Sequence, residues 1–204
     1  YYFLAPGLPE RQQTNARLSQ QNLQQDLYWL PDDRYRLSAH FWRQQSDRQI
    51  PPTNTQNRSE AHQDDLATRL ILDFSRTAGA GGWQIKTGFF DERINYFDDQ
   101  TALESRNRFR SWLLELTGQW NWRKRHRFLA GNTHVYTRAW SAGYRDNIPT
   151  EYKTALFASW KFEGEKLKTQ LSLRQELVDG RRAPLVPAFG FDFFIRPQLV
   201  LKGK

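Results

Sequence analysis

The sequence predicts an all-β fold, an antiparallel up-and-down meander of about ten strands that forms part of a transmembrane β-barrel. Three observations support this prediction. Apolar residues recur at every second position, the alternating stretches are long, and the connections between them alternate between short and long. The stretches have about 12 residues, whereas strands of soluble proteins usually have about 5 to 6. A tilted strand that spans a bilayer needs roughly 9 to 11 residues.

The clearest alternation lies in residues 151–181. Apolar and aromatic side chains occupy one face of the first strand, and lysine and serine fill most of the other face. After a short turn at residues 163–165 the pattern resumes with leucines, so the two strands must pair antiparallel. The positions on the apolar face include Tyr152, Thr154, Leu156, Ala158, Trp160, Phe162, Leu167, Leu171 and Leu173.

The same pattern predicts strands along the rest of the chain. They are expected around residues 23–29, 35–42, 66–74, 83–89, 112–122, 127–142, 189–195 and from 199 onward. In residues 127–142 the alternation is blurred, and residues 1–15 are predicted to form a loop.

The connections differ in length on the two sides of the predicted sheet. Short turns are predicted at residues 31–33, 77–82, 123–126, 163–165 and 196–197, and longer loops at 46–65, 97–106, 144–150 and 178–186. In a meander every second connection lies at the same end of the strands. Short periplasmic turns and long extracellular loops are typical of outer-membrane barrels.

Large aromatic residues gather near both ends of the predicted strands. Such girdles mark the two membrane interfaces of a barrel. The predicted periplasmic belt consists of Trp29, Trp83, Trp120, Trp122, Trp160 and Phe162, and the predicted extracellular belt of Tyr96, Phe97, Trp140 and Tyr144.

Composition excludes helical membrane spans and disfavours nucleic-acid binding. The mean hydropathy is −0.82 and there is no run of about 18 apolar residues. A barrel is compatible with this composition, since only alternate residues face lipid. The net charge of +8 is spread along strands and turns, and the densest basic run, residues 123–127, lies between two predicted strands. We therefore expect no nucleic-acid partner.

Candidates for chemistry are sparse, and we expect no enzymatic activity and no cofactor. The four histidines are scattered, and the hydroxyl residues lack a nucleophile-elbow context. We predict no metal site. Paired acidic residues at predicted loop rims are nevertheless calcium candidates because Ca²⁺ prefers carboxylate oxygens. These candidates are Asp64, Asp65, Asp98 and Asp99.

Several segments resemble the barrel domain of TonB-dependent outer-membrane receptors, in particular cobalamin-transporter-like members from Bacteroidetes. The likeness runs from about Gln12 to the end of the chain and is carried by residues 46–53, 63–65, 70–74, 115–120, 173–181 and 186–192. These motifs are less specific than a metal or nucleotide signature.

The resemblance implies part of a 22-stranded barrel with an N-terminal plug, which takes up siderophores, cobalamin or other large nutrients with energy supplied through TonB. Residues 1–204 would be a partial barrel domain without a plug domain or a TonB box, in the outer membrane of a Gram-negative bacterium. The implied partners are outer-membrane lipid, the remainder of the barrel and its plug, the TonB complex and a small-molecule nutrient. The polar face would line the lumen with Lys86, Glu115, Lys153, Lys168, Arg174 and Glu176.

The sequence lacks methionine, and its first residues do not resemble a signal peptide. We therefore expect a portion of a longer protein, with a plug before it and about twelve further strands after it. Two other classes stay open. One is a soluble β-sandwich or lectin-like binding module, and the other is an outer-membrane enzyme of the small-barrel type, which needs a Ser–His pair.

Overall fold

The structure, a computed structural model, describes residues 2–3, 11–53, 56–141, 143–144, 148–196 and 198–203. It confirms an all-β antiparallel meander. The strands are β1 (Tyr2–Phe3), β2 (Arg11–Gln12), β3 (Leu18–Trp29), β4 (Tyr35–Gln49), β5 (His62–Ala78), β6 (Gly81–Asp98), β7 (Leu103–Trp122), β8 (His126–Ser141), β9 (Thr150–Glu163), β10 (Leu167–Val178), β11 (Arg181–Arg182), β12 (Val186–Arg196) and β13 (Leu199–Gly203).

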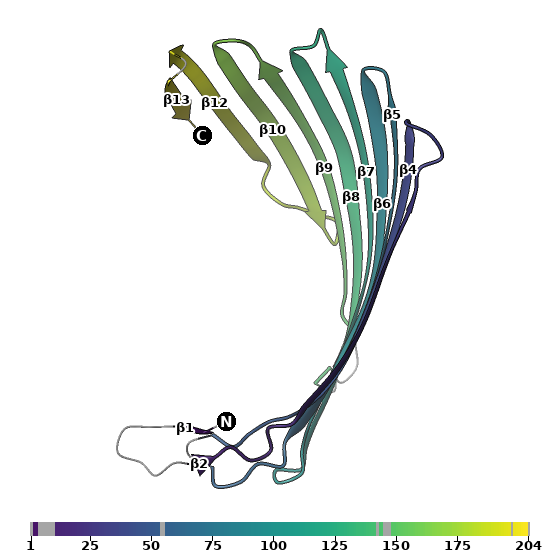
Figure 1. Ribbon diagram of the computed structural model, residues 1–204, viewed down its shortest axis with the longest axis vertical. Coiled ribbons are helices and arrows are strands. Elements are labelled where there is room, and N and C mark those ends of the chain that lie inside the picture. Colours follow the sequence, from purple (N-terminus) through teal and green to yellow (C-terminus); the bar gives the residue numbers. More distant parts are fainter. Residues whose placement is uncertain are drawn as a thin grey trace.

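One sheet of 11 strands contains nearly all of these elements. Ten of them follow one another from β3 to β13 with each strand paired to its neighbours in the chain, and β11 pairs only with β10. Figure 1 shows this sheet as a strongly curved and twisted wall, with β12 and β13 swung away from β4 and β5. The short strands β1 and β2 form a separate pair. The two-layer β-sandwich is contradicted by this single continuous layer.

The continuous register assigns every strand residue to one of two faces. From Leu37, successive directly paired residues are Phe74, Ile85, Leu116, Asn132 and Leu156, all on one face. We call this the apolar face. The other, the polar face, carries His40, Asp73, Lys86, Glu115 and Thr133 at neighbouring positions. The two faces predicted from the sequence therefore continue from strand to strand between β4 and β9.

The polar face is the concave side of the wall. The buried side chains that lie within strands are Ser38, Ser46, Ser111 and Ala155, and the register puts all four on the polar face. Side chains on the inner side of a curved sheet converge and cover their small neighbours. Side chains on the outer side diverge, which explains why most of the exposed large apolar residues lie on the apolar face.

The strands are longer than the sequence predicted, and several connections are correspondingly shorter. β6 has 18 residues and β7 has 20. The loop expected at residues 97–106 is wrong, because β6 continues to Asp98, β7 begins at Leu103 and only residues 99–102 connect them. The loop expected at 46–65 is reduced to residues 50–61. Polar residues at these positions pair in the sheet because the backbone hydrogen bonds do not depend on apolar side chains.

The five connections predicted to be short all lie at one end of the strands, along the upper edge of the sheet in Figure 1. We call this end the turn side and the opposite end the loop side. In the three-residue connection between β7 and β8, Arg123 and Lys124 have φ values of 49° and 60°, in the left-handed region that few residues other than glycine adopt. The turn-side connections span residues 30–34, 79–80, 123–125, 164–166 and 197–198. Residue 197 and most of the expected loop at 1–15 lie outside the described residues.

No helix in the described part of the chain is long and apolar enough to cross a membrane.

Candidate functional site

The apolar face presents a continuous band of exposed apolar side chains on the turn-side half of the sheet. Near its middle, Leu72 and Leu114 each expose 38% of their surface, and Leu156 exposes 57%. A soluble protein rarely exposes so large a contiguous apolar patch, which marks a membrane or protein contact. Other members of the band include Leu27, Leu70, Ile85, Leu116, Leu171, Leu173 and Phe189.

An aromatic row borders the band on the turn side. Every residue of the predicted periplasmic belt lies on the apolar face, namely Trp29, Trp83, Trp120, Trp122, Trp160 and Phe162. Trp120 stacks on Phe128 with ring centroids 6.0 Å apart. Trp160 Nε1 donates a hydrogen bond of 3.1 Å to His126 Nδ1. We call this set the turn-side aromatic row.

A second aromatic row, which sequence reasoning missed, borders the band on the loop side. Phe89, Trp112, Tyr136 and Tyr152 are directly paired in that order across four strands, and the ring centroids of Trp112 and Phe89 lie 5.3 Å apart. We call this set the loop-side aromatic row. Each of these residues lies within an ordinary alternating pattern, so only the register shows that they align.

The spacing of the two rows matches the apolar height of a barrel. Trp112 and Trp122 both lie on β7, ten positions apart, which corresponds to about 33 Å along a strand. At a strand tilt of about 40° this distance is about 25 Å across the membrane, the height of the apolar band of outer-membrane barrels.

The residues predicted for the extracellular belt are placed differently from one another. Phe97 and Trp140 lie on the apolar face, but both are further toward the loop side than the loop-side aromatic row. Tyr96 is paired with Gln63 and Ser105 on the polar face. Tyr144 lies in the connection between β8 and β9 and is exposed. We therefore assign the loop-side interface to the loop-side aromatic row.

Charged residues on the polar face are largely paired with one another. Lys86 Nζ lies 3.9 Å from Asp73 Oδ2, and Glu115 Oε2 accepts a hydrogen bond of 3.4 Å from Thr133. His40 Nδ1 contacts Asp26 Oδ1 at 2.6 Å. These contacts keep the concave surface polar and nearly neutral along the strands.

The remaining residues predicted for the lumen also lie on the polar face. Lys153 pairs with Glu151 at 2.8 Å, and Arg174 pairs with Glu176 at 3.2 Å. Lys168 Nζ lies 5.4 Å from the centroid of the Phe194 ring. All six predicted residues therefore share one concave surface, distributed over β6, β7, β9 and β10.

Several polar side chains interrupt the apolar face on β8 and β9. His134 Nδ1 lies 3.0 Å from Tyr152 Oη and 3.1 Å from Thr154 Oγ1. Asn132 Oδ1, also on this face, is buried without a hydrogen-bond partner in the described structure. These residues explain why the alternation of residues 127–142 is blurred, since polar side chains occupy positions of the apolar face there.

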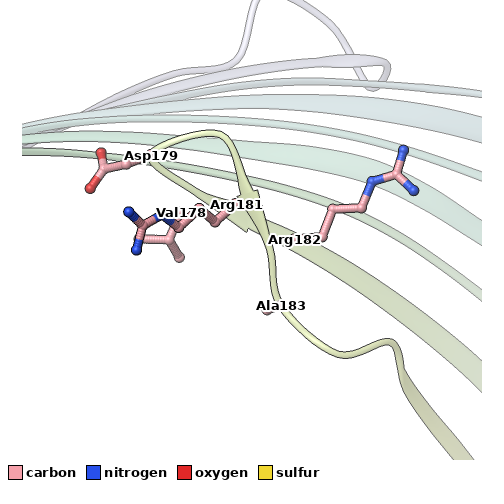
Figure 2. Close-up of a pocket in the computed structure, with 5 residues that line it drawn as sticks. All are labelled: Val178, Asp179, Arg181, Arg182 and Ala183. Atoms are coloured by element: carbon pink, nitrogen blue, oxygen red, sulfur yellow. The ribbon is translucent and has the colours of Figure 1, made fainter.

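A shallow depression of about 510 Å³ lies at the loop-side end of β10 and β11 and is lined by Val178, Asp179, Arg181, Arg182 and Ala183. Asp179 Oδ1 accepts a hydrogen bond of 2.8 Å from the Tyr152 backbone N–H. In Figure 2 the side chains of Asp179 and Arg182 point away from one another. The depression thus belongs to one tight turn and holds no convergent set of polar groups.

The calcium candidates are not brought together into a metal site. Asp64 and Asp65 are adjacent in β5 and lie on opposite faces. Asp98 accepts hydrogen bonds from the Gln100 backbone N–H and from Thr101 Oγ1, so its carboxylate closes the turn between β6 and β7. Within the described ranges, no group of three or more His, Asp or Glu residues is placed to hold a metal ion.

Known structures with the same fold are outer-membrane transporters. The chain is similar to the outer membrane transporter YddB from Escherichia coli, with a TM-score of 0.70 and 11% sequence identity over 83% of this chain and 29% of that chain. It is also similar to the copper transporter OprC, with a TM-score of 0.59 and 12% identity over 87% of this chain and 34% of that chain. No protein-family model and no curated protein matches the sequence.

These likenesses show the fold. The chain spans 29% and 34% of the length of the two transporters, and it has the architecture of part of an outer-membrane transporter barrel.

Proposed function

We propose that the chain forms part of the wall of a plugged barrel through which a Gram-negative bacterium takes up large nutrients, such as siderophores or cobalamin, with energy supplied by TonB. The observation that carries this proposal is the apolar band between the two aromatic rows. A band about 25 Å high with polar residues on the opposite side suits a barrel wall with lipid outside and water inside.

The two edges of the sheet support the presence of further strands. β3 and β13 end the path of paired strands, and all 12 residues of β3 are exposed. Lipid offers no hydrogen bonds to an unpaired edge, so spanning sheets close into barrels. We propose that β3 and β13 pair with other strands of the same barrel, and that a plug and the TonB complex act with it.

The polar face is the surface that we propose for the plug and the nutrient path. Lys86 and Glu115 are directly paired on it, and Lys153 lies one row nearer the loop side. Their partners Asp73, Thr133 and Glu151 come from the same concave surface. Paired polar groups of this kind let hydrophilic solutes pass without binding tightly to the wall. Loop-side turns would make the first contacts with the nutrient.

Copper is a poor candidate for the cargo at this part of the wall. The sequence has no Cys and no Met, the sulfur ligands that Cu(I) prefers. Larger nutrients that are recognised through many polar contacts suit the described residues better.

The function is tested by uptake in the host bacterium. Uptake of radiolabelled cobalamin and of ferric siderophores is compared in three strains. One strain is unchanged, one lacks the gene and one lacks TonB. We expect uptake of one of these nutrients to fall at least tenfold in both deletion strains and to return when the gene is restored. Unchanged uptake of all of them without the gene, or uptake that persists without TonB, would contradict the proposal.

The orientation of the wall is tested with adjacent residues of β7. Leu114→Cys places a thiol on the apolar face and Glu115→Cys places one on the polar face, in a chain that otherwise has no cysteine. In outer-membrane vesicles containing the intact protein, a charged maleimide should label Glu115→Cys at least ten times faster than Leu114→Cys. Equal rates would show that the apolar face is not in lipid.

A further inference from the structure

A cluster of arginines lies on the apolar face immediately beyond the loop-side aromatic row. We call it the outer basic cluster and define it as Arg93 of β6, Arg108 and Arg110 of β7, and Arg138 of β8, with Asp91 and Trp140 among them. Arg110 is paired directly with Asp91 on one side and with Arg138 on the other. Arg108 is paired directly with Arg93 and with Trp140.

The cluster has an excess of positive charge. It contains four guanidinium groups and one carboxylate, so its net charge is +3. Asp91 forms an ion pair with Arg108, receives a bond of 3.0 Å from Arg110 Nε, and lies 4.0 Å from Arg93 Nε. The nearby acids are occupied elsewhere, since Glu92 pairs with Arg69 on the polar face and Glu104 pairs with Arg106.

Arg138 is the member of the cluster that most needs an anion. It makes no ion pair with any described carboxylate, and its Nε is buried without a hydrogen-bond partner in the described structure. Its guanidinium lies 4.8 Å from the centroid of the Trp140 ring, a position that holds the group in place while leaving its donors unused. Arg110 faces it directly, and like charges at directly paired positions destabilise a sheet.

The guanidinium groups of Arg108, Arg110 and Arg138 all lie near the ring of Trp140. The guanidinium carbons of Arg108 and Arg110 lie 5.8 and 5.6 Å from its ring centroid, and that of Arg138 lies closer still. Arginine presents N–H donors in a planar fork that matches the oxygens of a phosphate group. Several such forks around one ring form a surface suited to a phosphate.

The height of the cluster identifies the source of that phosphate. The register row of Asp91, Arg110 and Arg138 follows directly after the row of Phe89, Trp112 and Tyr136 on the same face. Aromatic rows mark the membrane interface, so the cluster lies at the level of the headgroups and its members point outward. A lipid bound here would lay its acyl chains on Leu114 and its neighbours below.

We infer that the outer basic cluster binds the phosphate of a phosphorylated lipid in the outer leaflet, with Arg110 and Arg138 as its principal ligands. The inference rests on the outward orientation of the apolar face in the proposed function. Bound lipid would neutralise the opposed arginines and fix the barrel wall at its loop-side interface.

The test uses the intact protein in detergent and native mass spectrometry. The probes are lipid A, an acylated glucosamine disaccharide with two phosphates, its dephosphorylated form, and inorganic phosphate. The Arg110→Gln, Arg138→Gln double variant should bind lipid A at least tenfold more weakly than the unchanged protein. The matched control is Arg69→Gln, which removes a charge at a similar height on the polar face, and its binding should be unchanged.

Three results would overturn the inference. They are equal binding of lipid A by the double variant and the control, equal binding of dephosphorylated lipid A, or inorganic phosphate binding as tightly as lipid A. If the double variant does not fold, Arg138→Gln alone decides, because it breaks no described ion pair: a loss of at least threefold supports the site and no loss overturns it.

Nutrient uptake by strains that carry the same variants tests the proposed function separately. Nutrient uptake that persists in a variant with weakened lipid binding leaves both proposals standing. Lipid binding that depends on Arg110 and Arg138 without any TonB-dependent uptake supports the site and contradicts the transport proposal. Equal maleimide labelling of the two faces of β7 contradicts both.

Discussion

The turn-side and loop-side halves of β5 to β8 have the same backbone pairing and different outward side chains. On β7 the apolar face carries Trp112, Leu114 and Leu116 in one half and Arg106, Arg108 and Arg110 in the other, all within one unbroken register. The strand therefore does not end where its apolar pattern ends. Backbone hydrogen bonds set the length of the sheet, and the surrounding solvent sets the side chains on its outer face.

The polar face shows no such change between the halves. Asp73, Lys86 and Glu115 on the turn side and Arg69, Glu92 and Asp65 on the loop side are all polar, and most are paired within the face. A difference confined to the convex face means that the surroundings change on that side alone. Lipid against one half of the outer face and water against the rest produces this distribution.

The largest expected effect compares one substitution in the two halves. Leu72→Arg places a charge in the middle of the apolar band, whereas Gln45→Arg places the same charge on the same face in the loop-side half. We expect Leu72→Arg to lower the free energy of unfolding by about 2–4 kcal/mol and Gln45→Arg by about 0–1 kcal/mol, because the cost depends on membrane depth. Urea unfolding of the intact protein, embedded in lipid vesicles, measures both changes in the free energy of unfolding. Equal losses would mean that the halves share one environment.

A smaller effect is expected for two tryptophans of the apolar face. Trp112 belongs to the loop-side aromatic row and contacts Phe89, whereas Trp140 lies beyond it among arginines. Trp112→Ala should lower the free energy of unfolding by about 2 kcal/mol, since the proposed membrane would cover its exposed ring beside Phe89. Trp140→Ala should lower it by less than about 1 kcal/mol, since its half-buried ring loses mainly cation–π contacts with arginines. The reverse order would move the membrane interface to Trp140.

Period-two alternation and short turns suffice to predict most of the turn-side half. Between Trp83 and Phe89, or between Trp112 and Trp122, apolar and polar residues alternate because the two faces of the sheet differ in polarity. A turn such as residues 163–165 leaves only antiparallel pairing for its flanking strands. Both faces and the pairing order of these segments were predictable for that reason.

The loop-side half was missed because its pattern has no apolar contrast. Residues 90–98 and 103–111 carry polar and charged side chains on both faces, so alternation carries no signal even though their backbones pair throughout. For this reason the sequence predicted a loop at residues 97–106, where the structure has paired strands. Tyr96 was grouped with Phe97 for the same reason, since neighbouring aromatics look equivalent until the register separates their faces.

The outer basic cluster needs the register of three strands. Asp91, Arg110 and Arg138 are far apart in the chain and become neighbours only through the pairing of β6, β7 and β8. One visible signal was the recurrence of Arg106, Arg108 and Arg110 at every second position, which places three charges on one face of a strand.

The smallest expected effect concerns the turn-side end of the polar face, where Lys161 and Glu163 neighbour the turn between β9 and β10. Lys161 Nζ lies 2.9 Å from Glu163 Oε1, and its hydrogen bond holds the pKa of Glu163 below the ordinary value. Because the pKa is lowered in the folded state, the stabilising contribution is present at neutral pH. It is lost as the pH falls below about 4.3 and through the lowered pKa.

Carboxyl carbon NMR of the intact protein in detergent measures this titration. Lys161→Gln should raise the pKa of Glu163 toward the ordinary value, and Glu163→Gln removes the signal and confirms its assignment. The sign of the shift tests whether the polar face is in water at its turn-side end, since a desolvated carboxylate would titrate above the ordinary value. A raised pKa for Glu163 would therefore mean that this end of the polar face is dry. A lowered pKa places it in water, as expected for a surface that lines an aqueous lumen.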